Sequence, residues 1–303
     1  MHHSSSKRQP PTTMVALLRR YLSLRIVSEG TIEQYTLAAR NWDTIVKLPP
    51  RRLSEVTFAR FARRALAKGI GQNTVHTRMG TIASLWRFAA DHGWARPVPR
   101  VRKVSRIRRT PFAWRHDQLP KLFAACSDWR PAINSRRATR GWSSEHMVAL
   151  GLVLYFTSER ISAMMAVTRD HLDVDGMLLH VPGEMRKGKR EDKVYPLPRE
   201  VVELLTKLPP SKRLFPWNGK LQTLRLHWKR ILRVAGLPAN RNTVFHCMRR
   251  THATHMAIAA GVEAASRSTG HSSTAVTLWS YIDESQLPSM PASALLAMPL
   301  RLN

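Results

Sequence analysis

The sequence predicts a mainly α-helical protein with a small β-sheet in its second half. Apolar residues recur at helical spacing along most of the chain. Two short β-type segments, 177–181 and 193–197, flank a polar turn and are typical of a hairpin. The length of 303 residues suits two domains of about 100–200 residues each. We expect a disordered N-terminus over 1–11, an all-α domain over 12–95, a basic linker over 96–110 and an α+β domain over 111–303.

Four helices are expected in the first domain. The first begins after Thr12 and is ended by Ser28-Glu29-Gly30, and the second runs over 31–46 until Leu48-Pro49-Pro50 breaks it. The third covers 54–67. Asn73 is predicted to be the N-cap of the fourth. One buried stripe of this fourth helix consists of Val75, Met79, Ile82, Trp86 and Ala89.

The second domain is predicted to contain helices before and after its hairpin. The segment 144–157 is apolar nearly all round, which indicates a buried helix. Gly261 is expected to separate the last two helices. The predicted helices cover 117–125, 144–157, 200–207, 221–235, 249–260 and 262–267.

Net charge is the first property that indicates a partner. The chain carries 49 Lys and Arg against 20 Asp and Glu, a formal charge of +29, which favours a polyanion such as nucleic acid. No amphipathic Lys-rich anchor or lipidation signal points to a membrane. The linker adds a run of cations without an acid, and we expect it to track a nucleic-acid backbone, with an ordinary solvated charge run as the alternative. Its candidate DNA-binding residues are Arg100, Arg102, Lys103, Arg106, Arg108 and Arg109.

Several other classes of protein are disfavoured. The longest apolar run, Met147 to Phe156, is far shorter than the roughly 20 residues that span a bilayer. The N-terminus has no apolar segment behind its charges and is not expected to be a secretory signal. Cys126 and Cys247 are too few for a disulfide framework or a thiolate zinc site, so we expect reduced thiols in a cytoplasmic protein. We expect no metal, because the histidines near 246–271 match no zinc signature.

The candidate chemistry lies in an ordered set of short motifs. Thr157-Ser158-Glu159-Arg160-Ile161-Ser162 follows the buried helix, and the turn carries Lys187-Gly188-Lys189-Arg190. His246 and Arg249 are three apart at the start of a helix, where they share a face and the free N–H groups suit a phosphate. Gly270-His271 and Leu278-Trp279-Ser280-Tyr281-Ile282 come last. In this order of Arg, hairpin Lys, His-x-x-Arg, Gly-His and Tyr, the chain resembles the tyrosine recombinase (phage integrase-type) family over essentially its whole length.

The resemblance implies a site-specific DNA recombinase or integrase. Residues 12–95 would be the core-binding domain and 111–303 the catalytic domain, and the two would clamp double-stranded DNA as a C. It further implies a tetramer on two recombination sites, association with a bacterial-type nucleoid, and no metal or energy cofactor. A type IB topoisomerase-like activity and a catalytically inactive architectural DNA-binding protein are the alternatives.

The resemblance also implies a role for each residue of the set. Tyr281 would attack the scissile phosphodiester and form a 3′-phosphotyrosine, and Lys187 would protonate the leaving 5′-oxygen. The remaining four would hold the phosphate oxygens or assist through hydrogen bonds and proton transfer: Arg160, Arg249, His246 and His271. Arginine suits phosphate because its planar fork binds two oxygens at once, and a phenol with a pKa near 10 needs a cationic pocket to become a nucleophile.

Some assignments have competitors within the sequence. Glu159 could pair with Arg160 and make that arginine structural, and Lys189 competes with Lys187 for the hairpin role. Tyr281 could instead be a core aromatic residue beside Trp279. His252 and His255 match positions that the family commonly fills for structure.

The chain departs from the family pattern at three places. The family usually has Gly in place of Ser158 and Glu in place of Ala163, and Tyr281 lies ten residues after His271 where nine is usual. We expect the extra residue to be a tolerated insertion. The apolar patch 294–298 in the tail is expected to dock on a neighbouring subunit, with a frayed terminus as the alternative.

Overall fold

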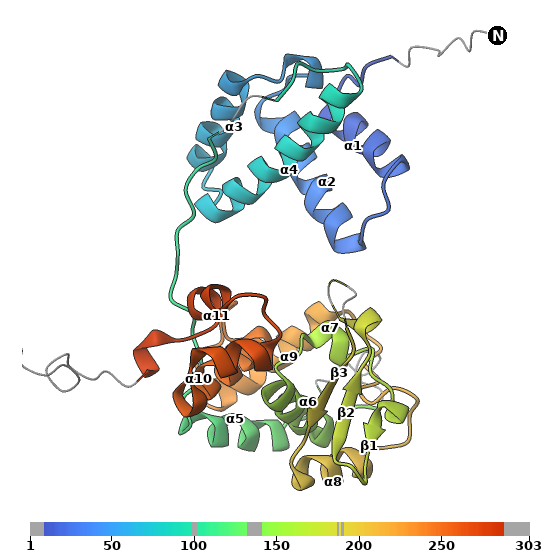
Figure 1. Cartoon of the computed structure of the whole chain (residues 1–303), viewed down its shortest axis with the longest axis vertical. Helices are drawn as coiled ribbons and strands as arrows, with labels where there is room; N and C mark the ends of the chain where they lie inside the picture. The colour runs from blue at the N-terminus through green and yellow to red at the C-terminus, as the bar shows by residue number, and fades with distance from the viewer. Residues whose placement is uncertain (1–8, 99–101, 132–140, 187, 189–190, 288–303) are drawn as a thin grey trace, which may run out of the picture. The chain divides into compact units, whose positions relative to one another are not determined.

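The computed structural model describes residues 9–98, 102–131, 141–186, 188 and 191–287. The chain divides into two compact units, 1–109 and 110–303 (Figure 1). The first is built from helices, and the second combines helices with one three-stranded sheet, which confirms the predicted fold class. Among the described residues, no helix is long and apolar enough to cross a membrane.

The first unit packs its helices around aromatic side chains. Trp42 lies 5.6 Å from Phe61 and 6.3 Å from Phe58 between ring centroids, and all three rings are fully buried. The Asp43 carboxylate accepts the free backbone N–H groups of Met14 and Val15, which fixes the start of the first helix against the second. The elements are α1 (Met14–Ser23), α2 (Glu29–Ile45), η1 (Pro50–Arg52), α3 (Glu55–Ala67) and α4 (Gln72–Asp91).

Two helix boundaries of this unit differ from the prediction. Ser28 occupies the N-cap of α2 and α1 already ends at Ser23, so Ser28-Glu29-Gly30 starts a helix and does not end one. Gly71 is the N-cap of α4, and the prediction for Asn73 is wrong. The Asn73 side chain is engaged elsewhere, since it donates to Ile107 O at 2.9 Å and accepts from Ile107 N at 2.8 Å.

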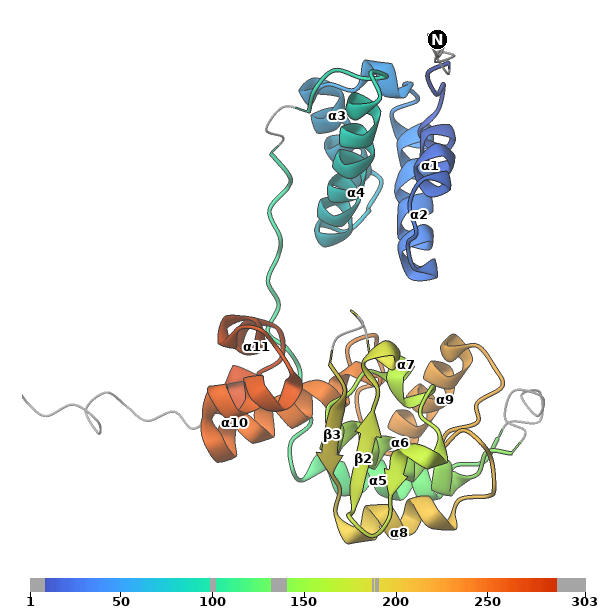
Figure 2. The same ribbon diagram turned by 45° about the vertical axis from the view of Figure 1, so that its right-hand side comes forward.

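The second unit is organised around α6 (Ser144–Thr157), whose burial the sequence predicted. Gly151 allows close packing there: an added Cβ would lie 2.9 Å from Phe123 Cε1 and 3.1 Å from Trp228 Cη2. The other helices are α5 (Gln118–Ser127), α7 (Ile161–Met164), α8 (Arg199–Lys207), α9 (Leu221–Val234), α10 (His246–Thr269) and α11 (Thr274–Ser280), with 3-10 turns η3 (Arg169–His171), η4 (Gly183–Met185) and η5 (Glu284–Gln286). Within the unit, α7 and α11 lie at the end opposite to α8 (Figures 1 and 2).

The sheet is antiparallel in the order β1 (Leu172–Asp173), β2 (Leu178–Val181) and β3 (Lys193–Pro196). Leu179 pairs with Tyr195, and Val181 pairs with Lys193. The two longer strands match the predicted hairpin. The sequence gives no sign of β1, because two residues are too short for an alternating pattern.

Helix α10 is bent where the sequence predicts a break. Gly261 has φ 84° and ψ 166°, which a residue with a Cβ rarely adopts, and it divides the helix into two arms. The first arm carries His246 and Arg249, and the second ends at Gly270, just before His271. One motif therefore lies at the start of α10 and the other directly follows its end. The short helix α11, which carries the chain to Tyr281, was not predicted.

Candidate active site

The site begins at the C-terminus of α6, where the chain turns sharply. Ser158 has φ 54° and ψ 15°, a left-handed conformation that glycine adopts more easily than serine. This is the position where the sequence departs from the family's usual Gly. The Arg249 Nη1 donates to Ser158 O at 2.5 Å and to Ser158 Oγ at 3.3 Å. The serine hydroxyl therefore gives the buried guanidinium a contact that glycine lacks.

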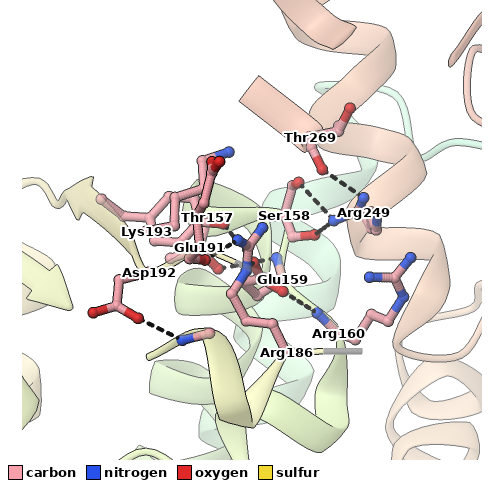
Figure 3. Close-up of polar contacts among 12 residues, drawn as sticks. Thr157, Ser158, Glu159, Arg160, Arg186, Glu191, Asp192, Lys193, Arg249 and Thr269 are labelled. Carbon is pink, nitrogen blue, oxygen red and sulfur yellow. Dashed lines mark hydrogen bonds and ion pairs between the residues drawn. The ribbon is translucent and has the colours of Figure 1, made fainter. Parts of the chain in front are cut away.

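Arg249 is almost fully buried, with 2% of its surface exposed, and is bound by neutral groups. Its Nη2 donates to Thr269 O at 2.6 Å (Figure 3). The same Nη2 contacts His271 Nε2 at 2.9 Å. Its Nε is buried without a hydrogen-bond partner in the described part of the chain. Burial lowers the pKa of Arg249, and Arg160 adds to that effect while Tyr281 opposes it. A buried cation that lacks a carboxylate partner is suited to an anionic ligand.

Arg160 occupies the N-cap of α7, directly after the turn at Ser158. Its charge contributes to lowering the pKa values of His246, Arg249 and His271. The structure rejects the alternative pairing with Glu159. The Glu159 carboxylate accepts the Arg160 backbone N–H at 3.2 Å, whereas its ion pair is with Arg186. In Figure 3 no dashed line ends on the Arg160 guanidinium.

The position of the proton on His271 follows from its contacts. Arg249 only donates hydrogen bonds, so Nε2 of His271 must accept. Nδ1 lies 2.8 Å from Thr277 Oγ1 and 3.0 Å from Thr269 Oγ1, and it carries the proton. Burial, followed by the charges of Arg249 and Arg160, lowers the pKa of His271 to about 4. The ring is therefore neutral near pH 7.

Tyr281 follows α11 at its C-cap, and its ring lies among the other candidates. The ring centroid is 4.2 Å from that of His271 and 5.3 Å from that of His246, and the Arg249 guanidinium carbon lies 5.2 Å from it. The next residue, Ile282, is completely buried and anchors the chain there. Although it lies ten positions after His271, Tyr281 reaches this cluster, whereas the neighbouring Ser280 is exposed.

His246 lies at the N-terminus of α10 and reaches the surface. Partial desolvation of its ring, then the charges of Arg250, Arg249 and Arg160, lower the pKa of His246 to about 4. It is thus a second neutral imidazole beside Tyr281.

The structure brings together five of the six predicted catalytic residues: Arg160, His246, Arg249, His271 and Tyr281. The sixth, Lys187, and its competitor Lys189 lie outside the described residues.

Two polar residues next to this cluster were not identified from the sequence. Arg186 contacts Glu159, with Nε to Oε1 at 2.6 Å. Lys193 donates to Ser268 O and, at 3.3 Å, to Arg267 O, so it binds the carbonyl end of α10. Burial, with help from Arg186 and Arg249, lowers the pKa of Lys193 to about 8. Neither residue belongs to a motif that the sequence pattern singles out.

His252 and His255 make internal contacts. His252 Nδ1 donates to Tyr155 O at 2.7 Å, and His255 Nε2 donates to Trp114 O at 2.9 Å. Across the described ranges, His, Cys, Asp and Glu form no group of three or more that could hold a metal ion.

Buried histidines make the stability of the second unit depend on pH. Burial lowers the pKa values of His146, His252 and His255 to about 4 from the ordinary 6.5. Between these values the unfolded chain binds more protons than the folded one. The free energy of unfolding should therefore be highest above pH 6.5 and fall toward pH 4, by up to about 1.4 kcal/mol per pH unit for each histidine.

Urea unfolding at pH 7, 6 and 5 measures this loss. His146→Gln should make the pH dependence shallower, because His146 Nδ1 accepts from Ser143 N at 3.2 Å and cannot gain a proton without losing that bond. His180→Gln, on the exposed face of β2, is the control. A free energy of unfolding that stays constant from pH 7 to pH 5 would contradict the prediction.

The basic linker is ordered where the structure describes it. We call residues 102–109 the strap. Its backbone is bound by the first turns of α4: Gln72 Nε2 donates to Ser105 O at 2.9 Å, Asn73 holds Ile107, and His76 Nδ1 contacts Val104 O at 2.6 Å. These contacts leave its candidate cations exposed, namely Arg102, Lys103, Arg106, Arg108 and Arg109. Arg100 lies outside the described residues.

A family model described as the phage integrase family matches residues 114–287. A search of curated proteins finds no match. Among solved structures, the chain is similar to a lambda integrase dimer bound to a COC′ core site, with 15% identity, 93% of this chain and 81% of that chain covered, and a TM-score of 0.71.

Two other solved structures have the same fold. One is XerH site-specific recombinase bound to palindromic difH substrate, at 15% identity, with 90% of this chain and 82% of that one covered and a TM-score of 0.67. The other is the Tn1549 transposon integrase with transposon right end DNA, at 16% identity, with 93% and 97% covered and a TM-score of 0.67. At these identities the likeness establishes the fold alone.

Proposed function

The chain belongs to the phage integrase family of tyrosine recombinases, and from this premise we propose that it is a site-specific DNA recombinase. In the proposed reaction the Tyr281 hydroxyl oxygen attacks the scissile phosphorus and forms a 3′-phosphotyrosine. The bond from phosphorus to the 5′-oxygen breaks, and this oxygen leaves with the electron pair and takes a proton. Attack by the 5′-hydroxyl of another strand reverses the step and rejoins the DNA.

One observation carries this proposal: the Arg249 guanidinium lies beside the Tyr281 ring, and within the described residues neither Arg249 nor Arg160 is paired with a carboxylate. Phosphoryl transfer builds charge on the equatorial oxygens, and donors fixed beforehand stabilise that charge most effectively. Arg249 is fixed by its contacts to Ser158, Thr269 and His271. Within the described residues the Arg160 guanidinium has no ion pair, so its donors can bind a ligand.

The two imidazoles beside Tyr281 differ in whether they can accept its proton. His246 and His271 flank the Tyr281 ring, and each has a pKa of about 4. Because Nδ1 of His271 carries a proton and its Nε2 accepts from Arg249, we assign acceptance of the phenol proton to His246. We assign the proton for the leaving oxygen to Lys187 by its place in the sequence, with Lys189 as the alternative.

We further propose that four copies assemble on two DNA sites and that the strap contacts the DNA backbone. Support comes from the exposed cations of the strap and from its attachment to α4, since an ordered strap loses less entropy on binding than a free one. One solved structure with a similar fold is a lambda integrase tetramer bound to a Holliday junction.

The strap proposal predicts a change in salt dependence. Arg106→Gln should lower the slope of log affinity against log salt by about 0.9, the contribution of one phosphate contact. The measurement is fluorescence anisotropy of a labelled duplex across a salt series. Arg115→Gln is the matched control, because Arg115 already pairs with Asp117 at 3.2 Å. An unchanged slope in Arg106→Gln would show that this cation does not bind phosphate.

The proposed function is tested by covalent trapping. A duplex that binds the protein is first selected from a random-sequence library. It is then nicked so that cleavage releases the short fragment that bears the 5′-hydroxyl, which prevents rejoining. This nicked duplex is incubated with the protein in EDTA. We expect a covalent protein–DNA adduct on a denaturing gel. Peptide mass spectrometry should identify Tyr281 as the residue that carries the DNA. Tight binding without an adduct would favour the architectural protein. Relaxation of supercoiled plasmids of unrelated sequence would favour the topoisomerase-like activity.

A further inference from the structure

We propose that the buried ion pair between Glu159 and Arg186 is a positioning device for Arg160, a role that rests on the proposed function. The two side chains are 1% and 15% exposed. Glu159 directly precedes Arg160, and Arg186 lies at the end of η4, 27 residues further along the chain (Figure 3). Neither residue belongs to the catalytic set assigned above.

The Glu159 carboxylate connects three parts of the unit. Its Oε1 accepts from Arg186 Nε and from Tyr195 Oη, both at 2.6 Å, and its Oε2 accepts the backbone N–H of Arg160 at 3.2 Å. The carboxylate thus joins β3 and the segment after η4 to the backbone from which the Arg160 side chain projects. Burial raises the pKa of Glu159, but the hydrogen bond from Tyr195 and the charge of Arg186 outweigh burial and leave this pKa below its ordinary value.

Arg186 makes further contacts that fix it in place. Its Nη1 donates to Glu191 O at 2.8 Å, so it ties together two points of the connection between β2 and β3. Its Nη2 lies against Gly270, where an added Cβ would be only 3.2 Å away. Gly270 directly precedes His271, and Glu159 directly precedes Arg160, so this one guanidinium lies near the residue before each of two candidate catalytic residues.

The ion pair therefore sets where the Arg160 backbone lies relative to the turn that carries His271. A buried ion pair adds little net stability compared with apolar residues of similar size, but breaking one by removing a single partner is costly. Its value here is geometric, because misplacing a reacting group by about 1 Å can cost about 100-fold in rate.

The test compares single-turnover cleavage of the selected, nicked duplex by wild type and by the double variant Glu159→Gln/Arg186→Met. The double variant keeps the net charge of the chain, so its DNA affinity should stay at the wild-type level. It also leaves neither charge buried alone, so the protein should fold, as checked by circular dichroism and thermal melting. We expect the cleavage rate to fall about 100-fold.

Tyr195→Phe is the matched control. It removes the other short hydrogen bond to the same carboxylate oxygen but leaves the contacts of Arg186 and Arg160 intact. Its cleavage rate should stay within about threefold of wild type, less than the effect of one misplaced group. An equal loss in Tyr195→Phe and in the double variant would overturn the specific role of Arg186.

A mutant cycle that combines the double variant with Arg160→Lys distinguishes positioning of Arg160 from a general effect on the fold. If the ion pair acts through Arg160, the double variant should cause little further loss of rate once Arg160 is replaced. A full additional loss in the Arg160→Lys background would overturn the proposal. So would a folded double variant that binds and cuts as wild type does. A wild-type protein that forms no adduct would instead refute the proposed function, and this role with it.

Discussion

Tyr281→Phe should abolish the covalent DNA adduct and leave DNA binding unchanged. The substitution removes the oxygen that would attack phosphorus and retains the ring, which packs 4.2 Å from His271 and 5.3 Å from His246 between centroids. The substitution removes no Lys or Arg, so the electrostatic part of DNA affinity should not change. The effect on cleavage should be total, because no bond to the protein can form without the nucleophile.

Adduct formation on the nicked duplex and anisotropy binding, run in parallel, measure the two quantities. Ser280→Ala is the control, since Ser280 is the neighbouring hydroxyl and is exposed. We expect this variant to form the adduct at the wild-type rate. An adduct that persists in Tyr281→Phe and disappears in Ser280→Ala would place the nucleophile one residue earlier and make the enzyme a different class.

The sequence predicted those parts of the fold that depend on local pattern. The apolar surface of 144–157 identified α6 as a buried helix, and Gly261 marked the bend in α10 because few other residues adopt its backbone conformation. Asn73 was misassigned because an asparagine side chain can either cap a helix or bind a distant backbone segment. An asparagine at a helix start often caps it, but here the amide binds Ile107, a partner 34 residues away that no local pattern contains.

Some residues of the candidate site could be identified from sequence motifs, and others only from the tertiary structure. The order of motifs identified Arg160, His246, Arg249, His271 and Tyr281, which the structure brings together. It could not identify Arg186 or Lys193, because their partners, Glu159 and the carbonyls of Arg267 and Ser268, come close only through the tertiary fold. The alternative that Glu159 neutralises Arg160 was plausible from adjacency alone. Adjacent side chains in an extended segment point apart, and the longer-range partner Arg186 takes the carboxylate.

Arg249→Lys tests whether the geometry of the guanidinium matters beyond its charge. Lysine keeps the positive charge but has a single nitrogen, whereas Arg249 uses Nη1 for Ser158 and Nη2 for Thr269 and His271. An ammonium cannot make these contacts and also offer a further donor, as the unpartnered Nε–H of Arg249 can within the described residues. Loss of one fixed donor to a transition state costs about 100- to 1,000-fold in rate, so single-turnover cleavage should fall by at least that factor.

Arg250→Lys is the matched control for this variant. Arg250 is adjacent in the chain and carries the same charge, but unlike Arg249 it is only half-buried. Its replacement should change the cleavage rate by less than about tenfold, well below the loss of a fixed donor. The Arg249→Lys protein must be shown to be folded by circular dichroism, because it leaves the carbonyls of Ser158 and Thr269 without their donors. If folded Arg249→Lys cleaves as fast as wild type, then charge alone is sufficient and the fork of Arg249 does not bind the scissile phosphate.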